Sequence, residues 1–99
     1  MNDSREVERL VTELLGALKF YHGTTDRLKR LILRKGLRAG SYVSDEKFVA
    51  EGYARSYHEG EKVGIVTVTI PQNLILTYLD SDVESTVEVI KTIPPEFLS

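Results

Sequence analysis

A run of β-branched residues over residues 63–70, stopped by Pro71, places the strongest constraint on the fold of this chain. β-branched side chains favour strands, and proline ends a strand because it has no N–H to donate, so the run predicts a buried strand. Two further strands are expected at residues 74–79 and 87–90, separated by a polar turn at residues 80–82. Because the helical patterns come earlier, the order of elements favours an α+β fold.

The first helix is expected over residues 1–18, where apolar residues recur at helical spacing. Asp3 and Glu6 have the spacing of a capping box. The apolar stripe is formed by Val7, Leu10, Val11, Leu14, Leu15 and Leu18. A stripe of this kind covers a core or pairs with a second subunit, so a homodimer through this helix stays open.

A short aromatic strand is predicted at residues 19–22, followed by a helix that begins at Thr25 or Asp26 and ends at Gly36. Its predicted buried stripe is Leu28, Leu31 and Ile32, with Leu37 closing over the helix end.

A strand at residues 41–44 is expected to precede a third helix that begins at Asp45 and ends near Gly60. One face of this helix is predicted to consist of Phe48, Val49, Gly52 and Tyr53.

Length and composition exclude several classes of protein. The 99 residues suit one domain, 1–99, and a balance of 13 basic against 15 acidic residues argues against a polyanion binder that relies on a basic field. The absence of cysteine excludes disulfides, thiol nucleophiles and cysteine zinc sites, and two histidines make no metal site by themselves. Apolar windows far shorter than the ~20 residues of a membrane span, and an N-terminus unlike a signal peptide, lead us to expect a soluble cytoplasmic protein.

Three groups of residues carry candidate chemistry. His22 ends a strand just before Gly23, where a bare backbone lets a flat ligand approach. Two tyrosines, Tyr42 and Tyr53, suit the walls of a pocket for a planar ring. The third group is a pair of carboxylates at Glu84 and Glu88. The residues alone equally allow a histidine that only bonds a loop, tyrosines that belong to the core, and solvated carboxylates.

The order of these motifs along the chain resembles the ADP-ribosyltransferase superfamily. The likeness covers about residues 20–98 and rests on Tyr21-His22-Gly23-Thr24, Ile32 to Gly36-Leu37, Tyr42-Val43-Ser44, Ala50 to Tyr53, Val63 to Ile70 and Ile93-Pro94-Pro95-Glu96-Phe97-Leu98. The resemblance implies a small split antiparallel β-sheet fold over residues 19–99. It also implies an enzyme that transfers ADP-ribose from NAD to a protein or nucleic-acid acceptor and releases nicotinamide.

The resemblance further implies roles for single residues. His22 would hydrogen-bond the nicotinamide ribose, and the backbone of Gly23 would bind the carboxamide. The nicotinamide would lie between Tyr42 and Tyr53. The remaining implied NAD-contacting residues are Thr24, Arg27 and Ser44, the last at the pocket wall.

A glutamate at the start of the last strand is implied to stabilise the oxocarbenium-like ribose, since a preorganised carboxylate favours that charge. Ungapped comparison with the closing Ile93 to Leu98 motif places this residue at Glu84, which we prefer. Strand slippage of one or two residues would bring Glu88 to the same place.

Two alternatives share the same fold. The RNA 2′-phosphotransferases also show Tyr-His-Gly-Thr, a Gly-Leu and a closing Pro-Pro-Glu, and Arg27 would be their phosphate-binding arginine. A noncatalytic derivative that binds NAD, another ligand or a protein is the second alternative. Tyr42 and Tyr53 with a nearby glutamate favour ADP-ribosyl transfer.

Overall fold

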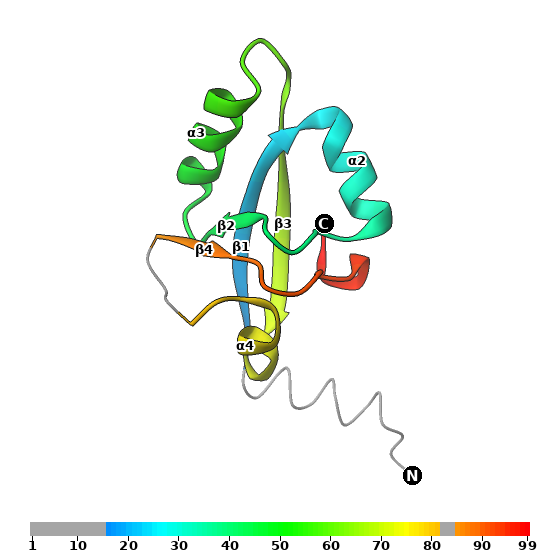
Figure 1. Cartoon of the computed structure of the whole chain (residues 1–99), viewed down its shortest axis with the longest axis vertical. Helices are drawn as coiled ribbons and strands as arrows, with labels where there is room; N and C mark the ends of the chain where they lie inside the picture. Colours follow the sequence, from blue (N-terminus) through cyan, green and yellow to red (C-terminus); the bar gives the residue numbers. More distant parts are fainter. Residues whose placement is uncertain (1–15, 82–84) are drawn as a thin grey trace.

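The computed structural model describes residues 16–81 and 85–99, which form a small α+β domain on one antiparallel sheet with the strand order β3-β1-β2-β4 (Figure 1). The elements are, in chain order, β1 (Ala17–Thr25), α2 (Asp26–Lys35), β2 (Tyr42–Ser44), α3 (Lys47–Tyr57), β3 (Val63–Pro71), the 3-10 turn η1 (Gln72–Leu74), α4 (Ile75–Tyr78), β4 (Thr86–Glu88) and the 3-10 turn η2 (Pro95–Phe97). The α+β prediction is therefore confirmed. Residues 1–15 of the predicted N-terminal helix lie outside the described residues.

The long pair β1 and β3 forms the centre of the domain. Every residue of β1 pairs with β3, from Ala17 opposite Pro71 to Thr25 opposite Val63. The strand begins two residues earlier than predicted, and the helix expected over residues 1–18 is wrong at residues 16–18. Gly16, which precedes the strand, has a φ of 77°, a left-handed conformation that interrupts a helix.

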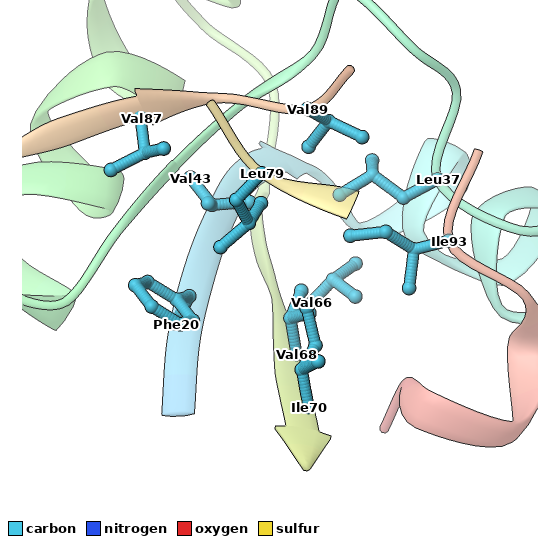
Figure 2. Packing of buried hydrophobic residues seen from close by; sticks show 10 residues of the cluster. All are labelled: Phe20, Leu37, Val43, Val66, Val68, Ile70, Leu79, Val87, Val89 and Ile93. Atoms are coloured by element: carbon cyan, nitrogen blue, oxygen red, sulfur yellow. The ribbon is translucent and has the colours of Figure 1, made fainter. Parts of the chain in front are cut away.

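The hydrophobic core lies on one face of this sheet. Directly opposite residues share a face, so Phe20 joins Val68 and Val43 joins Val87. Figure 2 shows the cluster, which consists of Phe20, Leu37, Val43, Val66, Val68, Ile70, Leu79, Val87, Val89 and Ile93. The fully buried residues of β3 confirm the prediction of a buried strand.

Helix α2 has the caps expected from the sequence. The Thr25 side chain accepts a hydrogen bond from the Leu28 N–H at 3.1 Å, and Gly36 ends the helix with a φ of 101°. Its packing differs from the prediction, because Leu31 is exposed while Ile32 and Leu33 pack against the core. Leu37 is buried after the helix, as expected.

We expect Thr25→Ala to lower the free energy of unfolding by about 1–2 kcal/mol, because it removes the side-chain acceptor at the helix N-terminus. Denaturant unfolding of the variant measures the loss. Thr77→Ala, at an exposed position in α4, is the matched control and leaves stability within about 0.5 kcal/mol of wild type. Equal stability of the two variants would contradict the capping role.

The segment predicted as a strand at residues 74–79 is instead η1 and α4. The chain turns helically after Pro71, and the Leu79 N–H closes the turn by donating to the Ile75 carbonyl at 2.8 Å. Leu79 then forms a β-bridge with Val89, just beyond β4. The last strand is accordingly Thr86–Glu88 rather than residues 87–90.

Helix α3 packs through small residues and not through the face predicted for it. Ala50 and Ala54 are buried, while Phe48 is 69% exposed. Alanine side chains are small, so the backbone of α3 packs closely against the sheet at these two positions. The larger side chains on the neighbouring face of the helix are left exposed as a result. None of the described helices is long and apolar enough to cross a membrane.

Candidate functional site

The sheet opens between β1 and β2, and a cavity lies there. The two strands are joined by the single pair Tyr21 and Ser44, whereas β2 continues to pair with β4 on its other side. The cavity has a volume of about 730 Å³. Small-molecule and cofactor sites are typically clefts of about 300–1,000 Å³, so this one is large enough for a nucleotide-sized ligand.

The cavity lies at the opening between the two faces of the sheet: His22, opposite the core residue Val66, comes from the core face, whereas Gly23 and Tyr42 belong to the opposite face. Tyr42 lies opposite Glu88 and alternates along the strand with the core residue Val43, so its side chain belongs to the other face. Helix α3 covers this face at Gly23, where an added Cβ would overlap the carbonyl oxygen of Ala50 and lie 2.6 Å from its carbonyl carbon. Glycine is therefore required here for the helix to close over the sheet.

The strand register also fixes the direction of the Gly23 backbone. The Asp26 N–H donates to the Lys62 carbonyl at 2.9 Å, and the Gln72 N–H donates to the Gly16 carbonyl at 3.1 Å. Even-numbered residues of β1 therefore exchange hydrogen bonds with β3, and odd-numbered ones point toward β2. Gly23 has no Cα partner on β2, so its N–H and C=O are directed to the opening that the cavity occupies.

His22 is held in one tautomer by the backbone of β2. Its Nδ1 lies 2.8 Å from the Tyr42 carbonyl oxygen, which only accepts, so Nδ1 carries the proton and donates. Burial lowers the pKa of His22, the Tyr42 carbonyl partly opposes this change, and His58 adds to the lowering. The neutral ring leaves Nε2 as a hydrogen-bond acceptor for a ligand.

As the pH decreases below 6.5, the ordinary pKa of histidine, we expect the free energy of unfolding to decrease. The reason is that His22 then binds a proton in the unfolded chain but not in the folded protein, where its pKa is lowered. The loss ends at the lowered pKa of the folded protein. Unfolding measured at a series of pH values tests this, with His22→Gln as the comparison. If the difference in free energy of unfolding between wild type and His22→Gln stayed constant as the pH decreased below 6.5, the lowered pKa of His22 would be contradicted.

Of the four tyrosines that line the cavity, one lies on β2 and two lie on α3 with their rings in contact. The Tyr42 hydroxyl donates to Glu88 Oε1 at 3.4 Å, and Tyr42 is half-exposed. The Tyr53 and Tyr57 rings stack one helical turn apart, with centroids 5.7 Å apart and planes 12° apart. A planar ligand group in the cavity therefore has aromatic surfaces within reach.

The structure brings together five of the residues singled out from the sequence. His22, Gly23, Tyr42, Ser44 and Tyr53 all line the cavity. Ser44 is buried, and its Oγ accepts from the Glu46 N–H at 3.1 Å, so this residue also fixes the start of α3.

The other predicted residues are placed differently. Thr24 is buried opposite Gly64, and Arg27 borders a separate depression with its guanidinium 3.7 Å from Glu61. Glu88 stands beside the cavity through its contact with Tyr42. Glu84 lies outside the described residues.

Among the cavity residues that were not predicted from the sequence, two lie at the end of α3 and carry side chains able to contact a ligand. Tyr57 and His58 line the opening at the end of α3. The spacing of four between Tyr53 and Tyr57 places both on one helix face, and this signal was available in the sequence. Within residues 16–81 and 85–99, no three histidine or acidic side chains are grouped as metal ligands.

Comparison with known proteins finds no protein-family model that matches this chain and no significantly similar curated protein.

Proposed function

We propose that the protein is an NAD-dependent ADP-ribosyltransferase, which transfers ADP-ribose to a protein or nucleic-acid acceptor and releases nicotinamide. The observation that carries the proposal is the convergence of five residues from β1, β2 and α3 on one cavity. The same five residues are the ones that the likeness to the ADP-ribosyltransferase superfamily implies for the NAD site. Their convergence supports that likeness with independent geometry.

The cavity offers complementary groups to the nicotinamide end of NAD. A carboxamide has one donor group and one acceptor, and Gly23 presents an N–H and a C=O side by side toward the opening. Tyr42 and Tyr53 supply aromatic surface for the ring. The free Nε2 of His22 accepts a hydrogen bond from a ribose hydroxyl.

Glu88 is the carboxylate that we assign to the reacting ribose. As the glycosidic bond breaks, the ribose carbon becomes cationic, and a fixed negative charge lowers the energy of that state. The Tyr42 hydroxyl and the ladder position opposite Tyr42 orient the Glu88 carboxylate beside the cavity. We therefore propose Glu88 for this role; Glu84, the other candidate from the sequence, lies outside the described residues.

The position of Arg27 favours ADP-ribosyl transfer over RNA 2′-phosphotransfer. RNA 2′-phosphotransfer would depend on Arg27 to bind the transferred phosphate, and Arg27 instead borders the separate depression with Glu61. The contacts proposed for the nicotinamide end of NAD do not use Arg27, although its implied contact with NAD is equally absent from the cavity.

Nicotinamide release from NAD, followed by chromatography with wild type and His22→Ala, tests the proposal. We expect release by wild type and its loss in a folded His22→Ala protein. NAD binding without release would support the noncatalytic alternative, and the absence of both would reject the NAD-dependent function.

A further inference from the structure

His58 is a second imidazole at the cavity, and the fold does not need its side chain. It follows α3 directly and ends the helix through its backbone N–H, which donates to the Ala54 carbonyl at 2.9 Å. Any residue with an N–H provides that bond. The imidazole lines the cavity and is 30% exposed.

The two imidazoles have different partners. His22 donates from Nδ1 to a backbone carbonyl, whereas His58 Nδ1 lies 3.7 Å from Glu61 Oε2. A carboxylate beside Nδ1 favours the tautomer that carries its proton there, which leaves Nε2 as the basic nitrogen. Glu61 also lies 3.7 Å from the exposed Arg27 guanidinium. Both ion pairs of Glu61 are long and at least partly exposed, so they contribute little to stability, and the pair with His58 acts on the orientation of the imidazole.

A proton acceptor separate from Glu88 is chemically useful in ADP-ribosyl transfer. A carboxylate that takes a proton loses the charge with which it stabilises the cationic ribose. In the described part of the chain, His58 is the cavity-lining side chain that combines a basic nitrogen with an orienting carboxylate. His58 also acts electrostatically on His22: burial is the largest cause that lowers the pKa of His22, and His58 lowers it further.

We propose that His58 is the general base for an acceptor hydroxyl, an assignment that rests on the proposed ADP-ribosyl transfer. The bond between the ribose carbon and the nicotinamide nitrogen breaks, and its electron pair leaves with neutral nicotinamide. The acceptor oxygen forms the new bond to the same carbon, and its proton passes to His58 Nε2, which later releases it to solvent. The acceptor is therefore a group that loses a proton as it attacks, for which we propose a hydroxyl; an ionised carboxylate would need no base.

Two small nucleophiles separate this role from a structural one. Methanol must lose a proton as it attacks the ribose carbon, whereas azide attacks as an anion and needs no base. NAD is incubated with each in turn, and the ADP-ribosyl product and free nicotinamide are quantified. The proteins compared are wild type, His58→Ala, Glu61→Gln and, as a control, Glu59→Gln, which changes the exposed residue next to His58.

General base catalysis contributes about 10²–10⁴-fold, so His58→Ala is expected to lose methanol transfer by that factor and to keep azide transfer. Glu61→Gln is expected to show a smaller loss with methanol only, and Glu59→Gln no loss. Equal loss with both nucleophiles, or no loss with methanol, would overturn the base assignment while the transferase function stands. A wild type that transfers to neither nucleophile would overturn the transferase function and this assignment with it.

Discussion

Gly23→Ala is expected to destabilise the protein by about 3 kcal/mol or more, the upper part of the range for overpacking substitutions. The new methyl group would overlap the carbonyl oxygen of Ala50, which belongs to the backbone of α3 and cannot rotate away. Helix α3 would have to move off the sheet, and Tyr53 would leave the cavity with it. Denaturant unfolding and circular dichroism measure the loss of stability.

Gly52→Ala is the matched control for this variant. Gly52 lies in the same helix, and an added Cβ there has no atom within 4 Å. Alanine has the higher helix propensity, so this variant is expected to be more stable than wild type by about 0.5–1 kcal/mol. Opposite signs at the two positions would confirm that space at Gly23 sets the position of α3. A Gly23→Ala protein as stable as wild type would show that α3 does not need this contact.

Glu88→Gln is expected to reduce nicotinamide release by about 10²–10³-fold, the effect of removing one preorganised electrostatic group from an active site. The substitution keeps the size of the side chain and removes only its charge. Glu88 is half-buried and accepts one long hydrogen bond from Tyr42, so the fold should tolerate the change. Single-turnover release of nicotinamide, with unfolding measured on the same sample, separates the rate from stability.

Three further variants test whether the loss of rate comes from the charge of Glu88. Tyr42→Phe keeps the ring and removes the hydroxyl that orients Glu88, so its loss of rate should be smaller than that of Glu88→Gln. Glu59→Gln, an exposed carboxylate outside the cavity, should leave the rate unchanged. A large loss in Glu84→Gln together with an active Glu88→Gln would assign the carboxylate role to Glu84 instead.

The sequence predicted those elements whose local signals agree with their packing. Residues 63–70 combine β-branched composition with a proline stop, and they form the buried strand β3. Thr25 and Gly36 mark both ends of α2 because capping is decided by the nearest few residues. The site residues that share a short motif, His22 and Gly23, could likewise be singled out from neighbouring positions.

Other features depend on contacts that no local pattern contains. Residues 74–79 have the apolar composition of a strand, yet within the described residues their strand-like pairing is confined to the bridge between Leu79 and Val89. The packing face of α3 is set by Gly23, more than 20 positions away, which admits Ala50 at the expense of Phe48. His58 lines a cavity that forms where β1 and β2 separate beyond the Tyr21 and Ser44 pair, which the residues around position 58 do not reveal.

The central claim is that the cavity between β1, β2 and α3 binds the nicotinamide end of NAD. Amide proton and nitrogen resonances recorded during an NAD titration test it most directly, since each cavity residue reports separately. We predict saturable shifts at Gly23, Tyr42 and Ser44, and unchanged resonances at Gly16, which precedes β1 at the end of the strand remote from Gly23. No saturable shift at Gly23, or shifts confined to the depression beside Arg27, would contradict the account.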